Sequence, residues 1–261
     1  MIMKDKKNLI MAAEALAILV ILGILLFSGN KTKLSPNGLE GPYSGEVEPL
    51  TKAETSLITN GTRRKERKNA IQSDGSMAPV MDVVTTDDSL SEHILRTPSR
   101  DLTLEDIGSD AFKILTARML ATVNAPGEEG VGIAAPQVGL NRRVILVQRF
   151  DKDGAPFETY ANIRLEKLSG NPKSGQEGCL SVPPKKGNVY RWPVVTISYI
   201  DPESLKPVHE TVSGYTSVIF QHECDHLDGR LYIDKASGIS IDQKWQAQLD
   251  SLGKVVGEGK K

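Results

Sequence analysis

Two histidines and the acidic residue between them have the types and spacing that metal chemistry needs. The stretch QHECDHLDG, residues 221–229, holds His222 and His226 four positions apart. On a helix of about 100° per residue these side chains lie one turn apart on one face, so they can share a metal ion. Glu223 lies on the flank of that face, where the two-histidine motif needs a proton carrier. The alternative is that two histidines share a helix face by accident.

A metal held by two imidazoles needs a further protein ligand, since catalytic sites commonly use three ligands and keep one position open. The chain has two cysteines, Cys179 and Cys224, which are too few for a disulfide framework. Cys224 points to the far side of the helix from the histidines, so we expect a packed core thiol there. The sulfur of Cys179 suits a divalent transition metal, but a buried free cysteine is also common as simple packing. Spacing leaves both interpretations of Cys179 open.

A divalent metal at such a site favours hydrolysis of an amide. The ion supplies hydroxide near neutral pH and polarises a carbonyl oxygen. Glu223 would take a proton from the attacking water and deliver it to the leaving amine. Negative charge on the intermediate then needs hydrogen-bond donors from backbone or side-chain amides. The motif therefore predicts a metal-dependent hydrolase.

The elements that must position these residues follow from the hydrophobic pattern. Residues 106–124 have apolar side chains at helical spacing, with Ser109 as a possible N-cap, and residues 214–229 predict a second helix that carries the histidines. Strands are predicted where β-branched and aromatic residues cluster, at 142–150, 158–168 and 194–201. The expected fold class is α+β, with mostly antiparallel sheets packed around a C-terminal metal-binding helix.

The first part of the chain is long and apolar enough to cross a bilayer. Residues 9–27 are apolar apart from Glu14. We expect an uncleaved transmembrane anchor within residues 1–29 and a membrane-associated protein. A secretory signal peptide is the alternative, although the residues after the apolar run form a poor cleavage site. Lysines flank both ends, so the sequence leaves open which side of the membrane the domain faces.

Composition divides the rest of the chain. Residues 30–76 are polar and cannot bury enough apolar surface to offset chain entropy, so we predict a disordered tether. A catalytic domain follows over 77–250, and a polar tail over 251–261. The formal net charge of −1 provides no basic field, and nucleic acid is not predicted as a partner.

Three motifs, taken in order, resemble those of the peptide deformylases. They are GVGIAAPQVG at 130–139, EGCLS at 177–181 and QHECDHLDG at 221–229. The resemblance covers about 77–249 and excludes the anchor and the tether. It implies metal-dependent hydrolysis of the N-formyl group from N-formylmethionyl peptides or nascent chains, with release of formate. It also implies one divalent metal ion, with Fe(II) expected and Zn(II) as the alternative.

The same resemblance implies roles for individual residues. The implied metal ligands are Cys179, His222 and His226. Glu223 would be the general acid and base, while the side-chain amide of Gln137 and the backbone N–H of Leu180 would hold the oxyanion. The residues expected to line the substrate, with the methionine pocket included, are Gly130, Val131, Gly132, Glu177, Gly178, Tyr215, Val218 and Ile219.

Departures from the family pattern leave the substrate open. The chain reads ANIRLEKLSG where an Asn-Pro turn is usual, and Pro184, Lys185 and Lys186 occupy a region that touches the substrate beyond methionine. The apolar N-terminus is also unusual, because an exported enzyme would meet few formylated chains. Two other functions therefore stay open. One is a membrane-tethered metallo-amidohydrolase or peptidase of the same fold with another substrate, and the other is a non-catalytic peptide-binding module.

Overall fold

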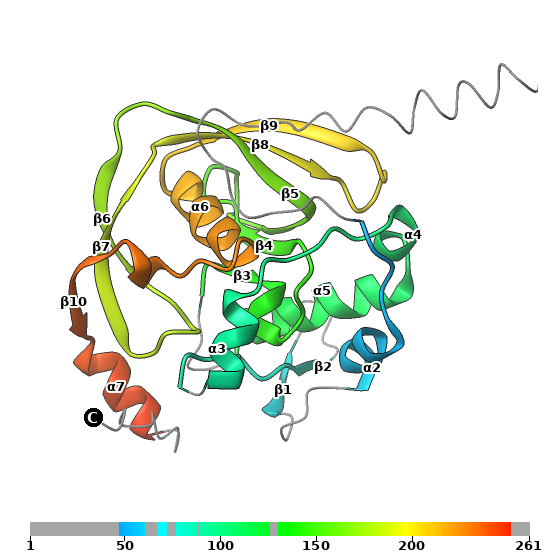
Figure 1. Ribbon diagram of the computed structural model, residues 1–261, viewed down its shortest axis with the longest axis horizontal. Helices are drawn as coiled ribbons and strands as arrows, with labels where there is room; N and C mark the ends of the chain where they lie inside the picture. Colours follow the sequence, from blue (N-terminus) through cyan, green and yellow to red (C-terminus); the bar gives the residue numbers. More distant parts are fainter. Residues whose placement is uncertain (1–46, 61–66, 72–76, 88, 126–129, 252–261) are drawn as a thin grey trace, which may run out of the picture. The chain divides into compact units, whose positions relative to one another are not determined.

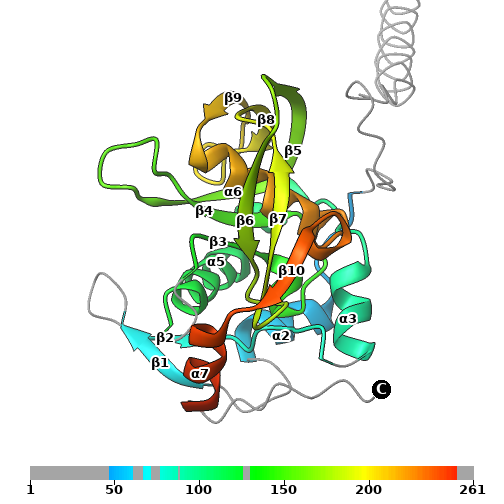
Figure 2. The ribbon, with the colours of Figure 1, turned by 90° about the vertical axis from the view of Figure 1, so that its left-hand side faces the viewer.

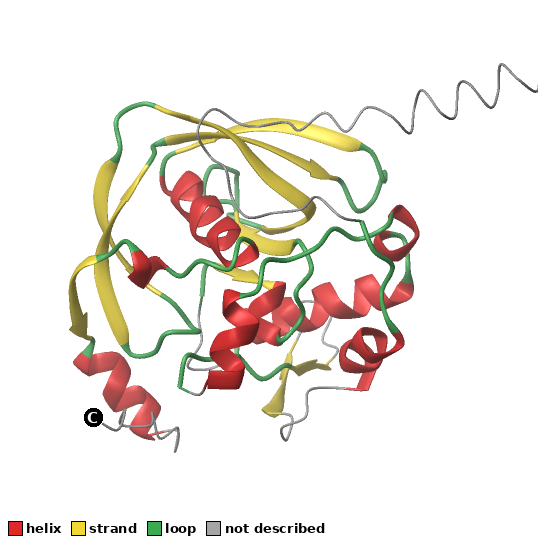
Figure 3. Ribbon diagram, viewed as in Figure 1, coloured by secondary structure: helices red, strands yellow, loops and turns green. Residues whose placement is uncertain are grey.

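The computed structural model describes residues 47–60, 67–71, 77–87, 89–125 and 130–251, where helices and antiparallel sheets combine (Figures 1 and 3). The largest sheet has the strand order β3-β4-β5-β8-β9, a small sheet has the order β10-β7-β6, and β1 pairs with β2. The strands are β1 (Arg67–Ile71), β2 (Met77–Val80), β3 (Gly132–Ala134), β4 (Val144–Gln148), β5 (Phe157–Ser169), β6 (Lys173–Gly178), β7 (Lys185–Arg191), β8 (Val194–Ile200), β9 (Pro207–Ser213) and β10 (Ser237–Ile241). The helices are α2 (Lys52–Asn60), α3 (Ser89–Arg96), α4 (Leu104–Ile107), α5 (Asp110–Val123), α6 (Tyr215–Leu227) and α7 (Gln243–Ser251), with the short 3-10 helices η1 (Ala135–Val138) and η2 (Tyr232–Asp234).

Helices α5 and α6 cover opposite faces of β4. Successive side chains of a strand point to opposite faces, and β4 is apolar on both. Val144 and Leu146 belong to the core cluster that contains the apolar side chains of α5. Ile145 and Val147 belong to the cluster that contains those of α6. The run VILV is therefore buried on both sides, and α6 is fixed against the central strands of the large sheet.

The predicted helices and strands are confirmed. Helix α5 begins after Ser109, whose hydroxyl accepts a hydrogen bond from the Phe112 backbone N–H at 3.2 Å. The runs at 142–150 and 194–201 contain β4 and β8, β5 extends one residue beyond each end of the run at 158–168, and the predicted helix at 214–229 contains α6. The strands of the small sheet were not predicted. Figure 2 shows this sheet with α7 following β10 at one end.

Residues 47–60 and 67–71 correct the prediction of a disordered tether over 30–76 and of a domain that begins at 77, because residues 67–71 form β1 and pair with β2. Ile58, on α2, is fully buried and belongs to the core cluster of α5. The guanidinium of Arg142, which is 2% exposed, donates to Glu54 Oε1 at 2.7 Å and to the Pro49 carbonyl oxygen at 2.9 Å. A buried arginine needs such acceptors, because an unpaired buried charge is costly. This part of the expected tether therefore belongs to the folded domain.

The other predictions for the chain ends lie outside the described residues. They are the anchor at 9–27, the first part of the tether at 30–46 and nearly all of the tail at 251–261. Among the helices that the structure does describe, none has the length and apolar character needed to cross a bilayer.

Removing the carboxylate that pairs with Arg142 should destabilise the domain. Glu54→Ala leaves the buried guanidinium without its counter-charge, so we expect the free energy of unfolding to fall by about 2 kcal/mol. Urea denaturation followed by circular dichroism measures the difference. Lys52→Ala, an exposed change on the same helix, is the control and should cost less than about 0.5 kcal/mol. If Glu54→Ala is as stable as the parent protein, residues 47–60 are not part of the cooperative unit.

Candidate metal centre

Helix α6 turns one face to the core and another to the predicted metal site. Phe220, Cys224 and Leu227 are buried in the cluster that packs on the large sheet. Cys224 is therefore the packed thiol that helix geometry predicted, and burial raises the pKa of this thiol. His222 and His226 lie on the other face, with ring centroids 5.2 Å apart.

Cys179 joins the two histidines from the small sheet. It follows the last residue of β6, and its Sγ lies 3.2 Å from His226 Nε2. Ligand atoms of Cys179, His222 and His226 all lie within 4.8 Å of one another. A metal with bonds of about 2.0 to 2.3 Å to nitrogen and sulfur can bridge donors that are this close. These three donors therefore fit one divalent transition metal ion. We refer to Cys179, His222 and His226 as the metal-binding triad.

The orientation of His222 is set by a buried ion-pair network. Its Nδ1 lies 2.8 Å from Glu177 Oε2, and Arg191 donates to both oxygens of Glu177 at 2.7 and 2.8 Å. Burial alone would raise the pKa of Glu177, but the hydrogen bonds from Arg191 and His222 outweigh it and lower the pKa to about 2. An ionised Glu177 accepts a hydrogen bond from the Nδ1–H of His222, which leaves Nε2 of His222 for a metal. Glu177 was expected to contact the substrate. It does line the cleft, but its carboxylate binds His222 and Arg191.

Glu223 is a buried carboxylate beside the triad. It is 4% exposed, and its Oε2 has no hydrogen-bond partner within the part of the chain that the structure describes. Burial raises the pKa of Glu223 to about 7, and the positive charge of His222 opposes part of that shift. A Cβ on Gly132 would lie 2.5 Å from Glu223 Oε1, so a side chain there would displace the carboxylate from its present position.

Gln137 lines the cleft, and its side-chain amide nitrogen lies near Cys179. Its Oε1 accepts from the Ala134 backbone N–H at 2.8 Å, which fixes the side chain within η1. Its Nε2 donates to Ser181 Oγ at 3.2 Å and lies 3.7 Å from Cys179 Sγ. Leu180, directly after Cys179, lines the same cleft. The two expected oxyanion donors therefore lie beside the triad.

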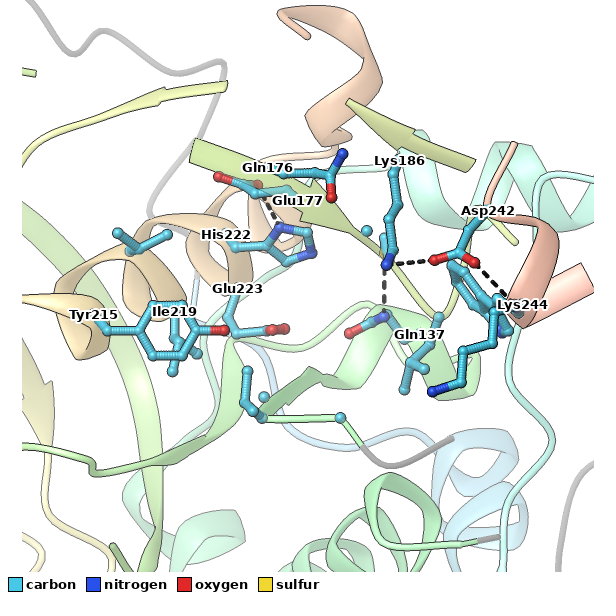
Figure 4. A pocket seen from close by; sticks show the side chains of 18 of the residues that line it. Gln137, Gln176, Glu177, Lys186, Tyr215, Ile219, His222, Glu223, Asp242 and Lys244 are labelled. Carbon is cyan, nitrogen blue, oxygen red and sulfur yellow. Dashed lines mark hydrogen bonds and ion pairs between the residues drawn. The ribbon is translucent and has the colours of Figure 1, made fainter. Parts of the chain in front are cut away.

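A cleft of about 510 Å³ opens over this centre (Figure 4). It is lined by every site residue predicted from the sequence except His226, which is buried beneath. Tyr215 and Ile219 lie on one side of Glu223, while Lys186, Asp242 and Lys244 lie on the other (Figure 4). Lining residues outside the predicted site set are Gln176, Lys186, Asp242, Lys244, Trp245 and Gln248.

Arg191 was also missed by sequence reasoning. It ends a strand with alternating polar residues, and no motif or spacing distinguishes it. Lys186 is the exception among these cleft residues, because it lies in the stretch that was expected to touch the substrate beyond methionine.

A cysteine sulfur, two imidazoles one helical turn apart and a buried acid beside them define a metal-dependent hydrolase centre. Comparison with known proteins agrees with this class. A family model described as polypeptide deformylase matches residues 80–241. The chain belongs to this family of metalloenzymes.

Relatives and solved structures support the assignment. A peptide deformylase of Leptospira biflexa is 32% identical over 170 residues, which are 62% of this chain and 93% of the relative. A class I type b peptide deformylase from Acinetobacter baumannii, solved with Met-Ala-Ser bound, has a TM-score of 0.53 at 31% identity and covers 60% of this chain and 99% of its own. A peptide deformylase from Synechococcus elongatus in complex with actinonin has a TM-score of 0.54 at 28% identity, with 75% and 96% covered. The predicted α+β fold is confirmed.

The two cysteines should differ in their effect on metal binding. Cys179→Ser should weaken metal affinity at least tenfold, because the thiolate belongs to the triad, whereas Cys224→Ala should keep the metal. Dialysis against a graded series of chelator concentrations, followed by elemental analysis, gives the two affinities. Retention by Cys179→Ser together with loss in Cys224→Ala would contradict the assignment of the ligands.

Proposed function

We propose that this protein hydrolyses the N-formyl group of N-formylmethionyl peptides and releases formate. The observation that carries the proposal is the buried carboxylate of Glu223, unpartnered at Oε2 among the described residues, beside the triad of Cys179, His222 and His226. Membership in the polypeptide deformylase family supports this reaction. The Met-Ala-Ser bound to the Acinetobacter baumannii relative supports a peptide that begins with methionine.

The triad would hold one divalent metal ion, which we propose to be Fe(II), with Zn(II) as the alternative. One thiolate and two imidazoles are acceptable ligands for both metals. When bound, the ion supplies hydroxide near neutral pH and polarises the formyl oxygen.

The remaining steps belong to the protein. Glu223 takes the proton of the attacking water and transfers it to the methionine nitrogen as the carbon–nitrogen bond breaks. Formate and a free α-amino group result. The negative oxygen that develops at the formyl carbon accepts hydrogen bonds from the Gln137 amide and the Leu180 backbone N–H. Because Gln137 is held at both ends of its amide, its donor is oriented before substrate arrives.

The substrate main chain binds between two sheet edges. β3 is an edge strand of the large sheet and β6 is an edge strand of the small sheet. Gly132 on β3 and Gly178 on β6 both line the cleft. An extended peptide adds to exposed strand edges through main-chain hydrogen bonds, and glycine allows close approach. The methionine side chain then packs on the wall formed by Val131, Tyr215, Val218 and Ile219.

We also propose that residues 9–27 anchor the enzyme in a membrane, with residues 1–29 as the anchor and residues 30–46 as the start of a tether. The support is the apolar sequence alone. The proposed substrate favours a domain on the side where formylated chains emerge from ribosomes. Protease protection of the domain in sealed membrane vesicles would determine its side.

Formate release tests the proposed reaction. The full-length protein, purified without oxygen and with its metal content measured, should release formate from formyl-Met-Ala-Ser. Glu223→Gln should keep the metal and lower kcat by about 10² to 10⁴-fold, because the proton carrier is lost while the ligands stay. Loaded metal with no formate from the parent protein would refute the proposal. It would leave another amide substrate or a peptide-binding role.

Gly132 should be required for the geometry of the site. Gly132→Ala places a methyl group 2.5 Å from the present position of Glu223 Oε1, so the carboxylate must move and we expect formate release to fall at least tenfold. Metal content should stay at the parent level. Gly175→Ala on β6 is the matched control, because a Cβ there meets nothing within 4 Å. Equal activity of both variants would show that the position of Glu223 does not limit turnover.

A further inference from the structure

One wall of the cleft is built by the C-terminal segment of the described chain. Asp242, Lys244, Trp245 and Gln248 line the cleft, and all four follow residue 241, where the match to the family model ends. Lys244, Trp245 and Gln248 belong to α7. The wall that α7 forms is therefore a feature of this chain that the family match does not include.

Helix α7 is fixed to the sheet that carries Cys179. β10 pairs with β7, with Ile241 opposite Lys185. The Asp242 backbone N–H donates to the Pro184 carbonyl oxygen at 2.8 Å, and the Asp242 carboxylate forms an ion pair with Lys186. The same carboxylate accepts from the Trp245 backbone N–H at 3.0 Å, which caps the first turn of α7. These contacts hold α7 at a set position beside the cleft.

Trp245 lies against the strand edge where the substrate binds. A Cβ on Gly178 would lie 3.5 Å from Trp245 Cζ3 and 3.5 Å from Lys186 Cγ. The indole edge and the alkyl stem of Lys186 therefore flank the last residue of β6. The charge of Lys186 is paired with Asp242. Directly beside Gly178 this wall offers a ligand the apolar edge of Trp245 and the alkyl stem of Lys186, while Lys244 and Gln248 add polar groups elsewhere in the lining.

The direction of an extended peptide brings its second side chain to this wall. Successive side chains of a strand point to opposite faces. If methionine points to the α6 wall, with Tyr215 and Ile219, the next side chain points away from it. Figure 4 shows Lys186, Asp242 and Lys244 on the opposite side of Glu223 from Tyr215 and Ile219.

We propose that α7 selects the residue after methionine, and that Trp245 packs against a large apolar or aromatic side chain at that position. This inference rests on the proposed deformylase function. Aromatic side chains provide large apolar contacts and add a favourable ring–ring term, so phenylalanine should be preferred over glycine. Trp245 is thus a specificity-determining residue of the cleft.

The test compares formyl-Met-Phe-Ser with formyl-Met-Gly-Ser as substrates of the full-length protein. The ratio of the two kcat/KM values should fall about five- to tenfold in Trp245→Ala, mainly through KM, and Trp245→Phe should retain most of it. Gln246→Ala, on the same helix but outside the cleft lining, is the matched control and should keep the parent ratio. An unchanged ratio in Trp245→Ala, with formate still released, overturns the inference and leaves the deformylase function standing.

Fluorescence provides a second readout that does not depend on turnover. The chain has two tryptophans, so Trp192→Phe leaves Trp245 as the sole indole. Binding of the product Met-Phe-Ser should shift the emission of Trp245, and Met-Gly-Ser should shift it less. No shift with either peptide at saturating concentration contradicts the proposed contact. A shift without formate release from any formyl peptide would preserve the contact and refute the reaction.

Discussion

The buried guanidinium of Arg191 on β7 binds Glu177 on β6 and Asp225 on α6, and it thereby joins the small sheet to the metal-binding helix. Glu177 also holds His222, and Lys235 pairs with Asp225 at 2.7 Å. Every charge in this network has an opposite partner, which offsets the cost of removing the charges from water. Because Cys179 directly follows β6, the same contacts bring its sulfur to the two histidines.

The cleft follows from this arrangement of two sheets. Once the small sheet is fixed against α6, the free edges of β3 and β6 both border the cleft, with a glycine from each in its lining. Exposed sheet edges are usually a risk for aggregation, because they offer unpaired main-chain groups. Here the same groups are available to an extended peptide. Helix α7, attached through β10 and Asp242, lines the cleft beside the β6 edge.

The burial of Glu223 beside the metal site costs stability and provides a reactive carboxylate. A buried carboxylate with an unpartnered oxygen, as in Glu223, is costly by the ordinary rules for polar groups. Such exceptions occur at functional sites, where the unmet hydrogen bond belongs to a ligand or substrate. Gly132 provides the room, because a Cβ there would overlap the carboxylate. The buried position of Glu223 therefore depends on the absence of a side chain at Gly132.

The sequence by itself determined what depends on local geometry. The spacing of His222 and His226 fixes their common face on α6, the same helical period sends Cys224 to the core, and Ser109 begins α5 as an N-cap. Together with the family motifs, these local patterns predicted the reaction class and the residues around the triad.

Only the tertiary structure decided the features that depend on partners far away in the chain. Residues 47–60 fold because Arg142 and the α5 cluster provide their contacts, although their composition predicts disorder. The strand KSGQEG, which is β6, has no apolar alternation and forms by pairing with β7. Arg191 reaches Glu177 on β6, and Trp245 lies beside Gly178, only because the chain folds in this way. These contacts join residues far apart in the chain, so no local pattern of residues predicts them.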